Sequence, residues 1–228
     1  MDNQYNAVLF DLDGTLIDTA EDFVACLNKL LVLKGKSPLP AADIRKVVSD
    51  GARAMVTLAF NIKEGENGFE DLKQQFLDMY LDNIANHSQL FPSLDGLLDW
   101  CHEQCIPWGI VTNKPRKYAE PLITALRLDS TMATLVCPDD VKNTKPDPEP
   151  MLKACSEISI NSENCLYVGD HARDILAGKN ANMKTIAAGY GYVHSPQEAL
   201  SWQAHWTVNT SQELTTLLKS LLAANGPA

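Results

Sequence analysis

The sequence predicts an α/β fold: a doubly wound parallel sheet into which an all-helical segment is inserted. Short, continuously apolar runs recur along the 228 residues, separated by segments long enough for helices. This alternation is typical of buried parallel strands joined by helices. Between about residues 16 and 87 there is no convincing strand, and the apolar residues are spaced as in helices. The interruption predicts a second structural unit inside the first.

Six apolar runs are the predicted strands of a Rossmann-like sheet. Each is short and continuously apolar, as expected for a strand buried on both faces. In chain order they are Ala7–Phe10, Ile106–Val111, Ala133–Cys137, Cys165–Val168, Lys184–Ala188 and the weaker His205–Val208. Ligands of such sheets bind beyond the carboxyl ends of the strands, so the residues that follow each run are the candidates for function.

The inserted segment contains four helical stretches. The first carries Phe23 and Leu27 on one face and stops at Lys34-Gly35, a basic last turn followed by glycine. The others cover Ile44–Val48, which breaks at Ser49-Asp50-Gly51, then Ala52–Phe60 and Phe69–Ile84. We expect residues 16–87 to form a helical cap, and residues 1–15 and 88–228 to form the catalytic core.

Composition excludes some partners. The net charge is −10 and the isoelectric point about 4.9, which disfavours nucleic acid and anionic membranes because both need a basic face. A small anionic substrate is compatible, since a metal ion and local cations can outweigh the global charge. The six cysteines form no Cys-x-x-Cys pair, and no stretch approaches a membrane span. We expect a cytoplasmic monomer or homodimer with reduced thiols.

The segment Asp11-Leu12-Asp13-Gly14-Thr15 follows the first predicted strand directly. Side chains two residues apart on a strand point to the same side, so the two carboxylates would share one face. Two such carboxylates repel each other unless a cation lies between them. The motif therefore predicts a magnesium site with a carboxylate nucleophile beside it.

Three further strand ends carry polar residues of a matching kind. The second strand runs into Thr112-Asn113-Lys114-Pro115, Lys145 follows the third, and the fourth ends at Gly169-Asp170 with Asp174 four residues on. This set suits phosphoryl transfer through an aspartyl phosphate, with Mg²⁺ and Lys145 neutralising the phosphate. The Thr112 hydroxyl would hold a phosphate oxygen, and Asp13 is placed to protonate the leaving group and then activate water.

These four motifs, in this order, resemble those of the haloacid dehalogenase-like hydrolase superfamily, over nearly the whole chain. The helical insertion resembles the cap of its phosphoglycolate phosphatase-like subfamily. The resemblance implies that Asp11 is the nucleophile and Asp13 the acid/base, which also binds metal through its carbonyl. It further implies that Asp11 and Asp170 are metal ligands, and that Asp174 supports Lys145 and the water shell of the metal.

Several segments are similar to one bacterial branch of that subfamily, among them Gly51–Val56, Val111–Pro115, Val141–Pro150 and Gly189–His194. The likeness implies a small phosphorylated metabolite with a carboxylate, either 2-phosphoglycolate or N-acetylmuramic acid 6-phosphate. We expect Thr112, Asn113 and Lys145 to bind the phosphate. Arg53, at the start of a cap helix, would contact the substrate; the alternative is a surface ion pair.

Other functions compete with a phosphatase. A phosphosugar mutase of the same superfamily would return the phosphoryl group to a sugar, whereas a dehalogenase would not be expected to keep the acidic Asp13. An inactive binding protein would be expected to lose Asp11, Asp13 or Lys145, and none is lost.

The roles of two residues stay open at this point. Asp174 could serve only to cap or pair on its helix, and His171, unusual after Gly169-Asp170, has no assigned role.

Overall fold

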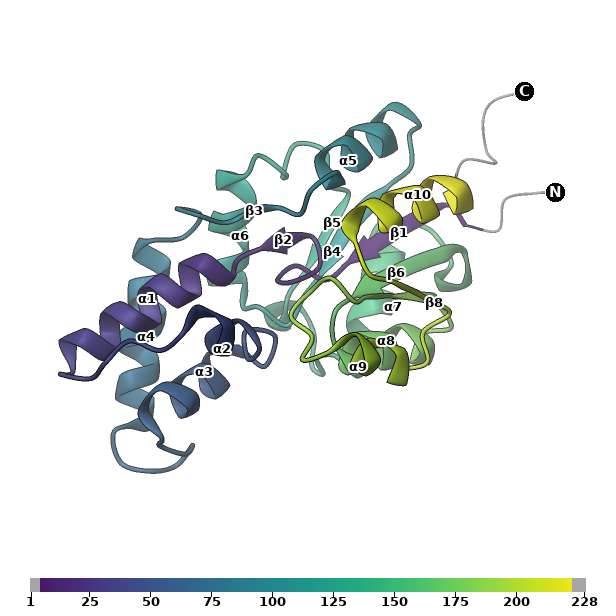
Figure 1. Ribbon diagram of the computed structural model, residues 1–228. Coiled ribbons are helices and arrows are strands. Elements are labelled where there is room, and N and C mark those ends of the chain that lie inside the picture. The colour runs from purple at the N-terminus through teal and green to yellow at the C-terminus, as the bar shows by residue number, and fades with distance from the viewer. Residues whose placement is uncertain (1–4, 223–228) are drawn as a thin grey trace, which may run out of the picture.

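The computed structural model describes residues 5–222, so residues 1–4 and 223–228 of the predicted core lie outside the described part. Figure 1 shows a sheet covered by helices on both faces and, to one side, a separate group of helices. The sheet has six parallel strands in the order β5-β4-β1-β6-β7-β8. The predicted fold class, a doubly wound sheet with a helical insertion, is confirmed.

The observed strands fall on the six predicted runs; three are slightly shorter, two coincide and one is a residue longer. Pairing of β1 with β4 and β6 places the first strand at the centre of the sheet. The strands are β1 Ala7–Phe10, β4 Trp108–Val111, β5 Thr134–Val136, β6 Cys165–Gly169, β7 Lys184–Ala188 and β8 Trp206–Val208.

Alternating side chains of β1 pack into two different cores. Val8 and Phe10 belong to the larger core, whereas Ala7 and Leu9 belong to the smaller one, as the two-residue period of a strand requires. The larger core is covered by α5 Leu94–Glu103, α6 Arg116–Ala125 and α10 Ser211–Leu222, and the smaller by α7 Glu149–Glu157 and α8 Ala172–Asn180. The short helix α9 Pro196–Ser201 lies beside β7. The 3-10 turn η1 Pro138–Asp140 follows β5, and the 3-10 turn η2 Ser162–Asn164 precedes β6.

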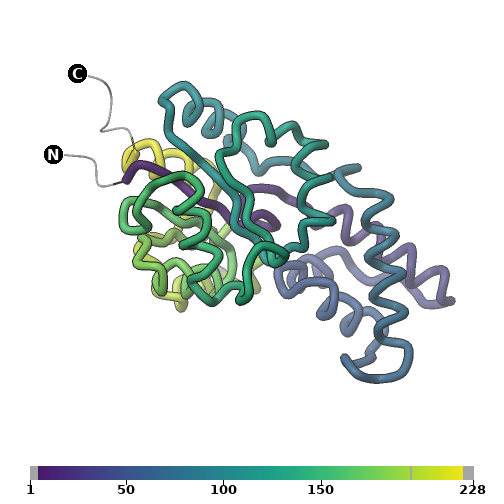
Figure 2. The backbone as a smooth tube through the Cα atoms, turned by 180° about the vertical axis from the view of Figure 1, so that it is seen from behind, coloured from purple at the N-terminus to yellow at the C-terminus, as the bar shows by residue number. Residues whose placement is uncertain are grey.

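The inserted helices are α1 Ala20–Leu33, α2 Ala41–Arg45, α3 Gly51–Phe60 and α4 Phe69–Asp82. Helix α1 ends at the predicted place, because Gly35 adopts a φ of +71° that favours glycine. Buried aromatic rings of α1 and α4 pack together; the Phe23 and Tyr80 rings stack with centroids 4.1 Å apart. Figure 2 shows these helices standing apart from the sheet in the view from behind.

One feature of the insertion was not predicted. Strands β2 Ile17–Asp18 and β3 Gln89–Leu90 form an antiparallel pair where the chain enters and leaves the helical group. The expectation of no strand from residue 16 to about 87 is therefore wrong at Ile17–Asp18, because a two-residue strand shows no periodicity that a sequence pattern could reveal. No helix within residues 5–222 is both long enough and apolar enough to cross a membrane.

Candidate active site

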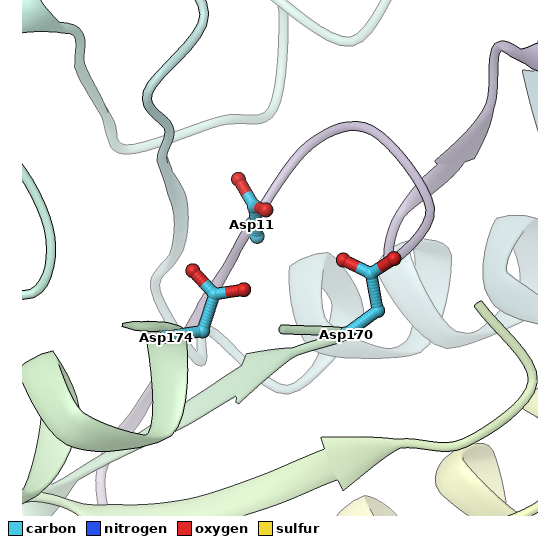
Figure 3. A group of neighbouring side chains, drawn as sticks. All are labelled: Asp11, Asp170 and Asp174. Atoms are coloured by element: carbon cyan, nitrogen blue, oxygen red, sulfur yellow. The ribbon is translucent and has the colours of Figure 1, made fainter. Parts of the chain in front are cut away.

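The predicted catalytic residues gather at the carboxyl ends of three adjacent strands. Asp11 follows β1, Thr112 follows β4 and Asp170 follows β6, and these strands are neighbours in the sheet. Asp174 comes from the first turn of α8, and Lys145 from the loop between η1 and α7. Figure 3 shows the side chains of Asp11, Asp170 and Asp174 lying side by side.

Lys145 lies at the centre of this group. Its ammonium Nζ is 2.9 Å from Asp11 Oδ1 and 2.7 Å from Asp174 Oδ1. It also donates hydrogen bonds to the Val111 carbonyl and the Tyr167 hydroxyl, both at 2.9 Å. The side chain is fully buried, and a buried ammonium is stable only when charges and acceptors surround it in this way. Lys145 is thus fixed beside Asp11 and not solvated in its loop.

The charges of this cluster shift one another's pKa values. Burial opposes ionisation of Asp11, but the Lys145 ammonium outweighs it and holds the Asp11 pKa below its usual value. Burial also opposes the charge of Lys145, and Asp11 and Asp174 reverse that effect, so the Lys145 pKa is raised. An ionised Asp11 next to a cation is the state that a carboxylate nucleophile requires.

Asp174 has two structural roles. One oxygen pairs with Lys145, and the other, Oδ2, accepts the backbone N–H of His171 at 3.1 Å. The second contact completes a capping box at the start of α8. Asp174 therefore caps its helix and supports Lys145 at once, so the two roles that the sequence left open occur together.

Asp170 has no cation partner among the described ion pairs. Its carboxylate is 1% exposed and accepts hydrogen bonds from Thr15 Oγ1 (3.2 Å), Ser49 Oγ (2.9 Å) and the Tyr192 N–H (2.9 Å). Burial, together with the charges of Asp11 and Asp174, raises the Asp170 pKa to about 7. A divalent cation would favour the ionised form of this carboxylate.

The surroundings of Asp170 fit a metal ion. One oxygen from each of Asp11, Asp170 and Asp174 lies within 4.8 Å of the others. Such an all-oxygen, carboxylate-rich set suits a hard cation. Two glycines leave no room for side chains here: a Cβ on Gly14 would lie 2.2 Å from Asp170 Oδ2, and one on Gly191 would lie 2.3 Å from the Gly14 carbonyl. Asp11 and Asp170, predicted as ligands, are brought together; the structure adds Asp174.

Asp13 lies next to this cluster but has different partners. Its Oδ1 accepts hydrogen bonds from Thr19 Oγ1 at 2.6 Å and from Lys114 Nζ at 2.8 Å. It lines the cavity, as Asp11 does, but its side chain is more exposed than that of Asp11. A carboxylate that is both anchored and accessible has the placement that an acid/base residue needs.

Thr112 and Asn113 both line the cavity. The Thr112 hydroxyl accepts the backbone N–H of Lys114 at 3.1 Å. The Asn113 amide binds both backbone groups of Lys145, donating to its carbonyl at 3.1 Å and accepting its N–H at 3.2 Å. Asn113 therefore ties the loop that carries Lys145 to the end of β4.

A cavity of about 500 Å³ lies between the strand ends and the inserted helices. Asp11 and Thr112 line it from the sheet, and Met55, Lys73 and Tyr80 line it from the helices. Arg53 lines it as well, but its side chain is 62% exposed and its Nε pairs with Glu64 at 3.1 Å. The surface ion pair considered for Arg53 is thus present, and the residue also borders the cavity, while its contact with a substrate stays a prediction.

His171 joins the two lobes. Its Nδ1 accepts the Arg173 N–H, which makes it the N-cap of α8, and its Nε2 is 3.4 Å from Asp50 Oδ1 in the cap. The Arg173 guanidinium donates to the Ser49 carbonyl beside it. The loop at Ser49 and Asp50 therefore touches Asp170, His171 and Arg173, which places His171 at the contact between cap and core.

Several residues at the site were not found from the sequence. They are Ser49, which bonds Asp170; Arg173 and Lys73, which line the cavity; and Tyr192, whose N–H binds Asp170. A faint signal existed for Ser49, which precedes the helix break at Gly51, and for Tyr192, which belongs to the aromatic stretch after β7. Lys114 stands two residues after Thr112, but only the fold reveals that it reaches Asp13.

Comparison with known proteins agrees with the fold and identifies the family. The family model of the haloacid dehalogenase-like hydrolases matches residues 8–188, and the chain belongs to that family. The chain is 44% identical to the N-acetylmuramic acid 6-phosphate phosphatase of Pseudomonas putida, over 95% of this chain and 97% of the relative. It is 38% identical to a phosphoglycolate phosphatase of Xanthomonas campestris pv. campestris, over 91% and 94%.

Solved structures share the fold. The crystal structure of a predicted phosphoglycolate phosphatase from Haemophilus somnus 129PT superposes with a TM-score of 0.83 at 24% identity, covering 95% of this chain and 99% of the other. Family membership and the resemblance expected from the four motifs are confirmed. The chain is thus an enzyme of a hydrolase family in which its similar relatives are phosphatases, as the sequence predicts.

Proposed function

We propose that this enzyme is a Mg²⁺-dependent phosphomonoesterase that acts through an aspartyl phosphate on a small carboxylate-bearing metabolite. The observation that supports this most is Lys145, buried between Asp11 and Asp174, two carboxylates that lie close to that of Asp170. A lysine and a carboxylate-rich cation site next to the same nucleophile suit the neutralisation of a phosphoryl group.

In the proposed reaction, Asp11 attacks phosphorus and the bond from phosphorus to the ester oxygen breaks. Asp13 gives its proton to that leaving oxygen. Asp13 then takes a proton from water while the water oxygen attacks phosphorus, and the bond to Asp11 breaks to release phosphate. Lys145 stabilises negative charge on the phosphoryl oxygens in both steps, and Thr112 and Asn113 orient them.

Asp11 and Asp170, with Asp174 beside them and the Asp13 carbonyl as a further ligand, would hold the magnesium ion. When bound, the ion supplies electrophilic stabilisation of the phosphoryl group and relieves the repulsion between Asp11 and the phosphate. Magnesium is proposed because an all-oxygen site beside a phosphate suits this cation.

Between the two substrates, the cavity favours the larger. A volume of about 500 Å³ lies within the range of roughly 300–1,000 Å³ typical of small-molecule sites, and 2-phosphoglycolate would occupy only a small part of it. N-acetylmuramic acid 6-phosphate has a sugar ring to fill the space beside Met55 and Tyr80 and a carboxylate for Arg53 or Lys73. The 44% identity to a phosphatase of that name points the same way.

Phosphate release measured with both esters tests the proposal. We expect kcat/KM for N-acetylmuramic acid 6-phosphate to exceed that for 2-phosphoglycolate by about tenfold or more, since the larger ligand makes more contacts. Faster hydrolysis of 2-phosphoglycolate would reverse the choice of substrate. Isomerisation of a hexose phosphate without phosphate release would instead establish a phosphosugar mutase. Cytoplasmic location, a monomeric or homodimeric state, and the exclusion of nucleic acid and membranes remain predictions.

A further inference from the structure

The buried ammonium of Lys114 connects the cap to the acid/base residue. Lys114 follows β4 in the core, and its side chain is only 6% exposed. Its Nζ donates to Asp13 Oδ1 at 2.8 Å and to the Tyr80 hydroxyl of α4, also at 2.8 Å. It also lies 4.8 Å from the ring centroid of Phe23 in α1 and 4.7 Å from that of Tyr80.

The two cap helices therefore fix the position of this cation. The Phe23 and Tyr80 rings stack on each other, and aromatic rings near a desolvated ammonium attract it. Burial, together with the charges of Asp13 and Asp22, raises the Tyr80 pKa well above its usual value, so the hydroxyl stays neutral and accepts a hydrogen bond from the Lys114 ammonium. If α1 and α4 move, the groups that hold Lys114 move with them.

Asp13 in turn depends on this arrangement. Among residues 5–222, the side chains that hydrogen-bond its carboxylate are Lys114 and Thr19, and Thr19 directly precedes α1. Both anchors thus change when the cap changes its position. By contrast, Asp11 is held by Lys145, whose partners all come from the core.

We propose that Lys114 is a positioning residue that orients the Asp13 carboxylate for proton transfer according to the position of the cap. The inference rests on the proposed phosphatase function and adds to it a coupling between cap and chemistry. Only with the cap in place does Lys114 hold the Asp13 oxygen that delivers a proton to the leaving group and later accepts one from water. Lys114 itself exchanges no proton and forms no bond to phosphorus.

The choice of leaving group distinguishes this role from others. Protonation by Asp13 matters for a sugar phosphate, whose alkoxide is a poor leaving group, but little for p-nitrophenyl phosphate, whose phenolate leaves readily. Both esters give the same phosphoenzyme, and both need Asp13 as the base in its hydrolysis. Impaired positioning of Asp13 should therefore slow every step except one: the formation of the phosphoenzyme from p-nitrophenyl phosphate in the first turnover.

The experiment compares Lys114→Met, which keeps the aliphatic stem, with Lys117→Met, an exposed lysine on the same segment. For Lys114→Met we expect kcat for the sugar phosphate to fall about 30-fold or more, with KM changing less than about threefold. With p-nitrophenyl phosphate under rapid mixing, a burst near one equivalent of p-nitrophenol should precede slow turnover. Tyr80→Phe, which removes only the hydroxyl bonded to Lys114, should show a weaker form of the same pattern.

Other results overturn the assignment. A rise in KM for the sugar phosphate at unchanged kcat makes Lys114 a substrate contact. Equal slowing of the first turnover for both esters, or wild-type rates in a folded Lys114→Met protein, removes any role in positioning Asp13. If Lys114→Met does not fold, Tyr80→Phe takes its place. The proposed coupling is then overturned if Tyr80→Phe hydrolyses the sugar phosphate with the wild-type kcat and shows no burst with p-nitrophenyl phosphate. Failure of the wild-type enzyme to hydrolyse either ester would reject the phosphatase function itself, a result distinct from these.

Discussion

The two sides of the cavity, the floor at the strand ends of the core and the roof formed by the cap helices, are built in different ways. On the floor, Asp11, Lys145 and Asp174 are buried and ion-paired at 2.7–2.9 Å, with Asp11 at the end of β1, Lys145 in the loop before α7 and Asp174 in the first turn of α8. On the roof, Arg53 is largely exposed, and Lys73 is paired with a surface carboxylate of its own helix. The floor can thus hold reacting groups in one geometry, whereas the roof can change its contacts with the substrate.

This difference separates the chemistry from the choice of substrate. Charges fixed in a site without water stabilise a transition state without reorganising, and such fixed charges supply most of the rate acceleration of many enzymes. Exposed cations contribute less to binding because water and salt screen them. Changes on the floor should therefore affect every substrate and have large effects, and changes on the roof should be small and depend on the substrate.

The largest expected effect comes from the nucleophile. Asp11→Asn removes the attacking carboxylate but keeps the shape of the side chain, so we expect phosphatase activity to fall by about 10³-fold or more. The protein should stay folded, because the amide oxygen can still accept from Lys145. Circular dichroism and thermal unfolding provide the folding control. Substantial turnover by a folded Asp11→Asn enzyme would contradict the assignment.

Removal of divalent cations should have the next largest effect. A chelator should abolish phosphate release, Mg²⁺ should restore it and Ca²⁺ should restore it poorly, because calcium prefers more ligands and a looser geometry. Mg²⁺ should also raise the Tm of the wild-type protein, since a ligand that binds only the folded state stabilises it. Asp170→Asn should lose that increase. Full activity in chelator would reject a metal site at these carboxylates.

Gly14 allows the Asp170 site to be tested by shape alone. Gly14→Ala combines a φ of +78° with a Cβ 2.2 Å from Asp170 Oδ2, whereas Gly35→Ala has a φ of +71° and no atom within 4 Å of its Cβ. Both should cost about 1 kcal/mol of stability from backbone strain. Only Gly14→Ala should also lose activity, by about 100-fold, because Asp170 must shift. Equal activity in the two variants would show that the position of Asp170 is not critical.

The floor could be predicted from the sequence far better than the roof. Asp11, Thr112 and Asp170 come directly after strands, and the topology of a parallel sheet brings such residues together whatever the details of the loops. Lys145 lies in a loop, and the sequence assigns it a role only together with the residues at the other strand ends. No local pattern connects this loop to the end of β4, and only the structure shows that Asn113 holds the Lys145 backbone there.

The roof depends on how helices pack, which no local pattern specifies. The helical spacing of Phe23 and Tyr80 indicates that both are buried, but not that their rings stack over Lys114. The strand pair β2 and β3 escapes prediction for a related reason. Each strand has two residues, and it exists only because the chain enters and leaves the cap side by side.

The smallest expected effect is at Arg53, on the roof. Its pairing with Glu64 must break or rearrange before it can contact a substrate carboxylate, so only part of a charged contact is available. Arg53→Ala should therefore lower kcat/KM for the carboxylate-bearing substrate by about tenfold, mainly through KM. An ester without a carboxylate should change by less than about threefold. The matched control is Glu64→Ala, which removes the ion pair but keeps the guanidinium, and which should preserve activity toward both esters. If Glu64→Ala reproduces the loss seen in Arg53→Ala, the ion pair acts by stabilising the cap. If Arg53→Ala changes kcat/KM for neither ester, Arg53 is a surface charge and other residues of the roof select the substrate. Lys73, a cation that lines the cavity, is then the candidate.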